Sequence, residues 1–571
     1  MMNNPLKIEF EKLRESSRHA VIQGDNDSLD ELRKYLHIER PVERNLESLI
    51  KDSANQSGGK LILVCGNVGD GKSHVLSYLN HKIKNEISCF KIHNDATEAH
   101  KPNETSIETL SRVLSPFCDN EIENTEHKLI LAINLGTLNN FLDEKKEDFQ
   151  SLYKYVEDNQ ILSSGFVINN ISQKCFKHVN FTDYHMYSLA KSQPKSDILS
   201  SVFNKIFSSN PNNLFFKAYL KHKKNIGSDS ECPILYNYEF LLDDNNKEQL
   251  IDLIIQAMVK TKEIISMRSI LNFIYDIIIP VDYSSSLYNG KLKENCKRSF
   301  FNNILPNYIF EHKTISSLLW NIGKLDPYHY RTSKLDEIGI NIYNSDEPVK
   351  FFIENGLFES GDVIENSINA LKNKDKEQII KLFTRLSFFR SKDFAKGDEF
   401  FYKYMQLLFD WNRNNLDAVK AINRLTEESI RKWNGDSKQA QKTIIDLGKK
   451  QTKYRVLKKL QLEPIFKKSN ESDKSELDVF LPQFTVTFKD SSETNTINVD
   501  YELFKLFEKI QRGYRPNRQD TNNNVSFANF TKELVSQEKV SELWIDEVNI
   551  GKESDFLLTK DSYGDYKFVK L

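Results

Sequence analysis

Residues Lys60 to Leu79, which read KLILVCGNVGDGKSHVLSYL, decide the fold of this chain. The apolar run Leu61–Cys65 is typical of a strand that is buried on both faces. The next segment, Gly66–Ser73, matches the pattern G-x-x-x-x-G-K-[ST] at every fixed position. Apolar residues then recur at helical spacing, with no proline or glycine to stop a helix. A strand, a glycine loop and a helix in this order are the context of a P-loop, which predicts a nucleoside triphosphate site.

The residue types of this loop explain the chemistry. Glycines let the backbone wrap closely, so that several N–H groups point at phosphate oxygens. The helix that follows directs its positive N-terminal end at the same phosphates. We expect Lys72 to reach the β- and γ-phosphates and Ser73 to ligate Mg²⁺. The alternative is a glycine-rich turn that binds nothing. The residues expected to bind the nucleotide are Gly66, Asn67, Val68, Gly69, Asp70, Gly71, Lys72, Ser73 and His74.

Two carboxylates follow a second predicted strand, Ile87–His93. Asp95 and Glu98 come at its carboxyl end, where ATPases keep acids that orient the metal or activate water. We expect Asp95 to face the metal and either residue to act in hydrolysis. The alternative is a capping box, in which Asp95 caps a helix and Glu98 stands at its third position.

A third predicted strand, Leu129–Leu135, places Asn134 where the aspartate of a Walker B motif is expected. Either Asn134 senses the γ-phosphate, or the acid on the metal side comes from Asp95 or Glu98. The substitution leaves the rate of hydrolysis open. Gly165–Asn170 is a candidate fourth strand, and it also ends in asparagines.

Two arginines are candidates for contacts with the γ-phosphate. Arg268 lies in the predicted helical segment Glu248–Pro280, at the start of a lid helix of the kind that senses the γ-phosphate in AAA-type ATPases. A surface arginine paired with a nearby acid is the alternative. Arg331 lies in Leu325–Glu337, a segment predicted to be an inter-subunit or inter-domain loop. It is either an arginine finger or an exposed loop residue.

The last part of the chain changes character. Phe484–Phe488 and Thr496–Val499 alternate like strands, a helix is predicted over Tyr501–Ile510, and short strands are predicted after Arg518 to the last residue. The turn Arg512–Arg518 is basic and aromatic. It either contacts a nucleic-acid backbone or is a solvated loop in which Tyr514 packs on its own domain.

The fold class predicted from these elements is α/β. It consists of a P-loop NTPase core with a mainly parallel sheet, extended by helical domains and a small C-terminal α+β domain. The expected boundaries are a helical N-terminal segment (1–58), the P-loop core (59–225), a helical lid-like region (226–345), a helical domain (346–470) and the α+β domain (471–571).

Composition limits the function classes. Hydrophobic residues make up 39% of the 571 residues, charged residues make up 28%, and the formal net charge of −2 gives no global basic field for nucleic acid. The six cysteines form no C-x-x-C pair, which favours reduced thiols. Neither a signal core nor an uninterrupted apolar span is evident, so we expect a soluble, cytoplasmic protein without membrane contact.

Several short motifs together resemble the DptF family, the ATPase component of DNA phosphorothioation-dependent restriction systems. They are Tyr35–His37 (YLH), Cys65–His74 (CGNVGDGKSH), His93–Glu98 (HNDATE), Ala132–Leu138 (AINLGTL) and Gly513–Pro516 (GYRP). The P-loop is generic. HNDATE and AINLGTL make the match specific.

That resemblance implies a bacterial defence role as an ATPase subunit that uses ATP and Mg²⁺. DNA without phosphorothioate modification would be attacked by a complex that includes a helicase-like component, and this chain would contact double-stranded DNA directly or through partners. Because no nuclease signature is evident, cutting would belong to another subunit. Two other classes stay open: a STAND-like signalling NTPase that does not touch DNA, and a small-molecule phosphotransferase, against which the long helical remainder argues.

Overall fold

The computed structural model describes most of the chain. The described residues are 4–14, 31–94, 105–162, 175–191, 193–226, 231–281, 293–330, 332–391, 398–437, 439, 441–449, 451–460, 462–466, 471–490, 493–537, 542–548, 556–560 and 565–571. The chain divides into two compact units. Unit 1 comprises residues 1–188, 195–397 and 478–480, and unit 2 comprises residues 189–194, 398–477 and 481–571.

A four-stranded parallel sheet organises the first part of unit 1. Its strand order is β2-β3-β1-β4, and every neighbouring pair is parallel. The strands are β1 (Lys60–Gly66), β2 (Lys91–His93), β3 (Lys128–Asn134) and β4 (Phe176–Asn180). Since β3 lies between β1 and β2, the strand order departs from the chain order next to β1, which is where ligands bind open α/β sheets. The structure is thus mixed α/β with a parallel sheet, as the sequence predicts.

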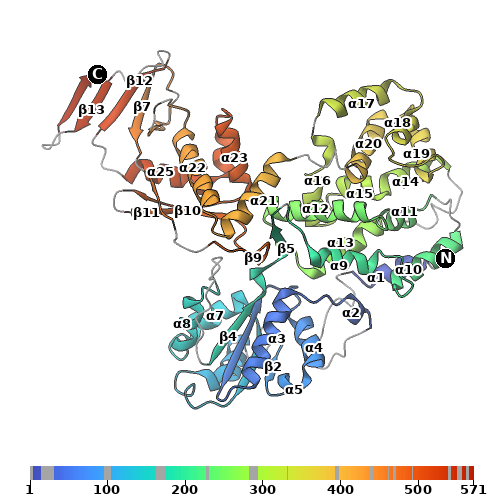
Figure 1. The fold of residues 1–571 in the computed structure, drawn as a ribbon, viewed down its shortest axis with the longest axis horizontal. Helices are drawn as coiled ribbons and strands as arrows, with labels where there is room; N and C mark the ends of the chain where they lie inside the picture. The colour runs from blue at the N-terminus through green and yellow to red at the C-terminus, as the bar shows by residue number, and fades with distance from the viewer. Residues whose placement is uncertain are drawn as a thin grey trace. The chain divides into compact units, whose positions relative to one another are not determined.

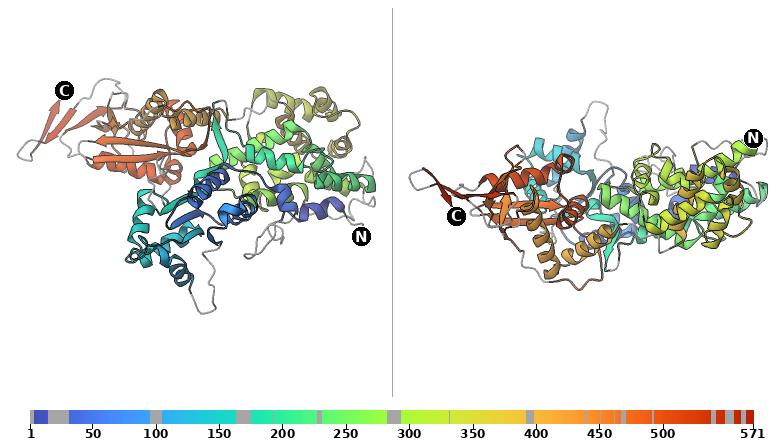
Figure 2. Two further views of the ribbon diagram at one scale, coloured as in Figure 1. Left: turned by 60° about the horizontal axis from the view of Figure 1, so that its bottom comes forward. Right: turned by 90° about the horizontal axis from the view of Figure 1, so that it is seen from above.

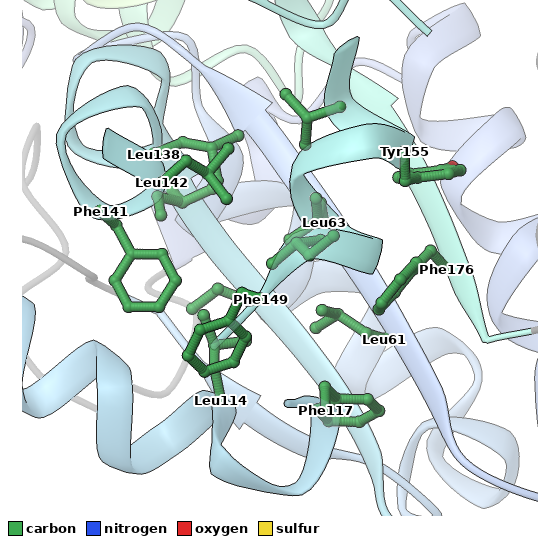
Figure 3. Packing of buried hydrophobic residues seen from close by; sticks show 14 of the residues in the cluster. Leu61, Leu63, Leu114, Phe117, Leu138, Phe141, Leu142, Phe149, Tyr155 and Phe176 are labelled. Atoms are coloured by element: carbon green, nitrogen blue, oxygen red, sulfur yellow. The ribbon is translucent and has the colours of Figure 1, made fainter. Parts of the chain in front are cut away.

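Alternate residues of β1 enter two separate cores, which explains the uninterrupted apolar run in the sequence. Leu61, Leu63 and Cys65 belong to one buried cluster, and Ile62 and Val64 belong to the other. Figure 3 shows the first cluster, in which the β1 leucines lie among side chains from η1, α7, α8 and β4. Helices α3, α4 and α5 supply the second. Both faces of the sheet are therefore covered.

Two glycines bound β1 where neighbouring backbone comes close. A methyl group placed on Gly59 would lie 2.2 Å from Thr125 Cγ2, and the Gly59 N–H donates to the Thr125 carbonyl at 2.6 Å. At the other end, Gly66 has a φ of 157° and leaves 2.9 Å between such a methyl group and Phe181 Cβ. Neither position accepts a side chain without a shift of the backbone around it.

The helices that surround the sheet and precede it come from the first 190 residues (Figure 1). They are α1 (Pro5–Glu11), α2 (Glu31–Leu36), α3 (Pro41–Ala54), α4 (Lys72–Lys82), α5 (Lys84–Ile87), α6 (Ser106–Leu114), η1 (Ser115–Phe117), α7 (Leu135–Lys145), α8 (Gln150–Asp158) and η2 (Phe181–Asp183). Strand β5 (Tyr184–Ala190) follows, and it forms a two-stranded sheet with β9 (Glu476–Val479).

The rest of unit 1 is helical in its described residues, coloured green to yellow in Figures 1 and 2. Its helices are α9 (Asp197–Ile206), α10 (Leu214–Ile226), α11 (Pro233–Phe240), α12 (Asp244–Thr261), α13 (Met267–Ile278), α14 (Lys293–Asn303), α15 (Leu305–Glu311), α16 (Ser317–Gly323), η3 (Pro327–His329), α17 (Ser333–Asn344), α18 (Pro348–Glu354), α19 (Val363–Leu371) and α20 (Lys376–Arg390).

A buried arginine joins three of these helical elements. Arg385 of α20 is 1% exposed, and its Nη2 donates to Asp326 Oδ2 at 2.6 Å and to Glu311 Oε1 at 2.7 Å. Its Nε donates to Asp326 Oδ1 at 3.3 Å and its Nη1 to Asn307 Oδ1 at 3.0 Å. The guanidinium is hydrogen-bonded on all three nitrogens, as a deeply buried cation requires.

Unit 2 combines helices with two antiparallel sheets, ordered β11-β10-β8 and β14-β13-β12-β7-β6. Its core is aromatic, and the Tyr404 ring packs edge-on against Phe484, Tyr501 and Phe504. The elements are α21 (Glu399–Asn412), α22 (Leu416–Lys432), β6 (Lys442–Ile444), β7 (Tyr454–Lys459), β8 (Glu463–Pro464), β10 (Phe484–Asp490), β11 (Glu493–Val499), α23 (Tyr501–Gln511), α24 (Arg518–Asn523), α25 (Val525–Gln537), β12 (Glu542–Glu547), β13 (Phe556–Lys560) and β14 (Tyr566–Lys570).

Two predictions in unit 1 are corrected. The strand predicted over Ile87–His93 begins only at Lys91, because Ile83, Ile87 and Phe90 enter the core at helical spacing. The loop predicted over Leu325–Glu337 is largely helical, and the Thr332 hydroxyl caps α17 by accepting from Leu335 N at 3.2 Å.

Two predictions near the C-terminal end also fail. The helical stretch expected to residue 470 ends at Lys432, and strand β7 forms by pairing with the distant β12. The short strands predicted after Arg518 begin only at Glu542, since α24 and α25 come first. Asn517 and Asp520 form a capping box that starts α24, a readable signal that was missed. The strands predicted over Phe484–Phe488 and Thr496–Val499 and the helix predicted over Tyr501–Ile510 are confirmed, and the two strands extend further into the predicted turn between them.

Across the described residues, no helix combines the length and the hydrophobicity needed to cross a bilayer.

Candidate nucleotide site

A hydrogen bond within the loop between β1 and α4 closes this loop. Asp70 Oδ2 accepts a hydrogen bond from the Asn67 backbone N–H at 2.6 Å. Gly71, the residue before helix α4, has a φ of 87°, in the left-handed region that favours glycine. Burial raises the pKa of Asp70, while the Asn67 N–H, Lys72 and Arg40 act in the opposite direction. The loop therefore places the N-terminus of α4 at the carboxyl edge of the parallel sheet, where its N–H groups attract anions.

Lys72, the first residue of α4, lies buried at the centre of this edge. Its ammonium group donates to the Asn67 carbonyl at 2.7 Å, to the Gly66 carbonyl at 3.0 Å and to Asn134 Oδ1 at 3.0 Å. The last contact joins the P-loop to the end of β3, since Gly66 and Asn134 are register partners. The sequence-predicted Lys72 and Asn134 are thus in direct contact.

Polar groups mark the ends of the two outer strands as well. Asn94 follows β2, and its buried Oδ1 atom accepts no hydrogen bond from the described residues. Asn180 ends β4 and donates from Nδ2 to Asp183 Oδ1 at 3.2 Å. Burial raises the pKa of Asp183 to about 6. Neither Asn94 nor Asp183 was among the site residues predicted from the sequence. The signal that could have found them is a polar residue just after an apolar strand segment.

A cavity of about 380 Å³ opens beside Lys72, within the range of ligand sites. One part of its wall is apolar and comes from the N-terminal segment, α9 and α13: Leu13, Leu32, Leu36, Ile38, Val202, Met267 and Leu271. The other part is mostly polar and comes from the P-loop, β3 and the residue after β2: Val68, Gly69, Gly71, Lys72, Ser73, His74, Asn94, Ala132 and Asn134.

The charged side chains described in the wall of this cavity are all positive. Five cationic side chains line the cavity: Lys12, Arg33, Arg40, Lys72 and Arg268. No carboxylate stands among the described lining residues. Arg268 is the second residue of α13, whose N-cap Ser266 accepts from Ser269 N at 3.1 Å. The arrangement suits an anion that also carries an apolar group.

A partly buried chain of side chains connects the N-terminal segment to α4. His37 Nδ1 lies 3.0 Å from His74 Nε2, and His37 Nε2 lies 3.4 Å from the fully buried Glu43. The His37 ring also stacks on Tyr78, with centroids 3.5 Å apart. Burial lowers the pKa of His74 to about 4, and the nearby His37, Arg40 and Arg33 act in the same direction. His74 is thereby held in its neutral form.

The predicted residues fall into three groups. Val68, Gly69, Gly71, Lys72, Ser73, His74, Asn134 and Arg268 line one cavity, and Gly66, Asn67 and Asp70 shape the loop beside it. Asp95, Glu98, Arg331 and the strand predicted over Gly165–Asn170 lie outside the described residues. The roles of the first group in binding and catalysis stay predictions.

Searches of protein-family models, of curated proteins and of solved structures find no match to this chain. The resemblance to the DptF family accordingly rests on its motifs.

Proposed function

We propose that this protein binds and hydrolyses ATP with Mg²⁺ at the P-loop. The observation that carries the proposal is the cavity beside Lys72, in which five cations and no described carboxylate adjoin an apolar wall. A nucleoside triphosphate has the matching chemistry, a polyanion attached to a flat, largely apolar base. Phosphate oxygens would take hydrogen bonds from the Lys72 ammonium, which now donates to three protein oxygens.

The metal would be held by Ser73, which lines the cavity at the start of α4. A hydroxyl oxygen beside phosphate oxygens is a donor set that Mg²⁺ accepts. Asp95 is proposed as the second protein group on the metal side. The ion would neutralise charge that develops on the phosphates.

Hydrolysis requires a group that orients the attacking water. Asp95 and Glu98 are the proposed acids, and Asn134 is the proposed γ-phosphate sensor because it already contacts Lys72. Arg268 would add a second cation from α13. All of these groups act by position and charge, which is what phosphoryl transfer mainly needs.

The proposed biological role is that of the ATPase subunit in a bacterial restriction complex that acts on DNA lacking phosphorothioate. Its support is the set of DptF-like motifs. Partners would include a helicase-like subunit, and DNA would be contacted directly or through partners. Arg515 and Arg518 of unit 2 are exposed and are the local candidates for a DNA backbone contact.

A STAND-like signalling switch is the second candidate. It is favoured by one observation: an asparagine, rather than an acid, meets Lys72 at the end of β3. Such a switch would hydrolyse ATP slowly and change oligomeric state with the nucleotide, without a response to DNA.

One assay separates these candidates. ATP turnover of the purified chain is measured with and without double-stranded DNA, beside Lys72→Ala. Stimulation by DNA supports the restriction role, and its loss in Arg515→Ala/Arg518→Ala assigns the contact. Slow turnover that ignores DNA favours the switch. Equal turnover by Lys72→Ala would refute the ATPase proposal.

A further inference from the structure

Arg40 lies directly over the P-loop although it belongs to the N-terminal segment. It is the N-cap residue of α3, and its backbone carbonyl accepts from Glu43 N and Arg44 N. A methyl group placed on Gly71 would lie 3.0 Å from Arg40 Nη2, so the guanidinium touches the residue that precedes α4. Arg40 also lines the cavity beside Lys72.

The position of this side chain is fixed by packing. Its Cζ lies 5.2 Å from the centroid of the Phe181 ring, a cation–π arrangement. Phe181 itself is buried in the core on the α3–α4 face of the sheet. The guanidinium is therefore held in place before any ligand arrives, which limits the entropy lost when one binds.

The N–H donors of the Arg40 guanidinium are available to a ligand. Within the described ranges its guanidinium makes no hydrogen bond and no ion pair, and no described carboxylate lines the cavity into which it faces. The nearest acid of the loop, Asp70, directs Oδ2 to the Asn67 N–H instead. A guanidinium carries five N–H donors in a fork that matches phosphate oxygens.

We infer that Arg40 binds the polyphosphate of the nucleotide, as a cation supplied in cis by the N-terminal segment. The inference rests on the proposed nucleotide site and adds a residue to it that the P-loop motif does not contain. Lys72 would meet the phosphates from α4, and Arg40 would meet them from the segment before α3. Nucleotide binding would then depend on that segment as well as on the sheet.

The test measures affinity for ATP, ADP and AMP, each with Mg²⁺, by calorimetry on the full chain. Arg40→Met keeps the length of the side chain and its contact with Phe181 but removes the charge. We expect roughly 10- to 100-fold weaker binding of ATP and ADP, and a change of less than about 3-fold for AMP. Arg40→Lys, which keeps the charge without the fork, should fall between wild type and Arg40→Met.

Arg44→Met is the matched control, because Arg44 lies one turn further along α3, is exposed and pairs with Glu39 at 3.7 Å. It should bind all three nucleotides like the wild type. Unchanged ATP and ADP binding by Arg40→Met would overturn the inference, and so would an equal loss for AMP, which indicates a structural role. If the wild type and Lys72→Ala both fail to bind ATP, the proposed function fails instead.

Discussion

Two arginines of unit 1, the fully buried Arg385 and the partly buried Arg40, are held in opposite ways. Arg385 meets Asp326, Glu311 and Asn307 with all three guanidinium nitrogens. Arg40 meets an aromatic ring and a glycine, with no described hydrogen-bond acceptor. We call a cation saturated when all of its donor nitrogens are hydrogen-bonded to protein groups. Such a cation contributes to the fold, because its removal leaves those groups without a partner. An unsaturated cation, whose donors have no protein acceptor, is the kind of group that can bind an anion.

The largest effect is expected at the saturated site. Arg385→Met leaves the Asp326 carboxylate, 4% exposed, without its counter-charge, and should cost about 3–5 kcal/mol of unfolding free energy. Denaturant unfolding of the full chain measures it. The double variant Arg385→Met/Asp326→Leu should regain part of the loss. A cost below about 1 kcal/mol for the single variant would remove the contrast between the two arginines.

At the P-loop the main effect should appear in turnover, with a smaller loss of stability. Lys72→Ala removes the ammonium group that we propose for the phosphates, and we expect ATP hydrolysis to fall about 10²- to 10³-fold or more. The unfolding temperature without nucleotide should also fall, but by less than that of Arg385→Met, because the three protein oxygens that accept from Lys72 lose their donor. Lys82→Ala, at the other end of α4 and paired with Glu47 at 2.8 Å, is the control that keeps its turnover.

A pH titration probes the histidines that hold the N-terminal segment to α4. The pKa of His74 falls from the ordinary 6.5 to about 4 in the folded state, so the unfolded chain binds the proton first as pH drops. The stabilisation is complete above pH 6.5 and is lost between 6.5 and 4. It is worth at most about 3 kcal/mol.

Comparing variants isolates this contribution, because burial also lowers the pKa of His178 and His222 to about 4. His74→Gln should flatten the dependence of stability on pH in that window. His81→Gln, an exposed histidine of the same helix, should leave it unchanged. Equal slopes in wild type and His74→Gln would show that His74 titrates alike in both states.

The smallest effect, and one of opposite sign, is expected at the unsaturated arginine. Without nucleotide, Arg40→Met should leave the unfolding free energy unchanged or raise it by up to about 1 kcal/mol, since it removes a desolvated charge. With ATP, its thermal shift should be smaller than that of the wild type. A loss of several kcal/mol without nucleotide would place Arg40 in the same class as Arg385.

The sequence predicted what depends on neighbours in the chain. The strand, the glycine loop and the helix over 60–79 form as expected, and Asn134 ends the strand beside them. Local pattern suffices there, because each element has its own periodicity and its own turn residues.

What could not be predicted depends on distant pairing. Arg385 and Asp326 are 59 residues apart, and nothing near either one announces the other. Arg40 stands in an ordinary polar segment, and only the course of the chain into α3 brings it over Gly71. Strand β7 likewise needs β12, whose Trp544 is the register partner of Leu457. No local motif encodes such contacts.

The central strand has a consequence for how its alignment is encoded. In a strand with one wet face, a slip by one residue exposes the apolar side, so the pattern itself fixes the register. β1 is apolar and buried at every position from Leu61 to Cys65, so a slip would only exchange one core for the other. The register is instead fixed at the two ends of the strand, where Gly59 packs against Thr125 and Gly66 packs against Phe181. Conservative exchanges within the strand should therefore be tolerated, while a single added methyl group at either end should not.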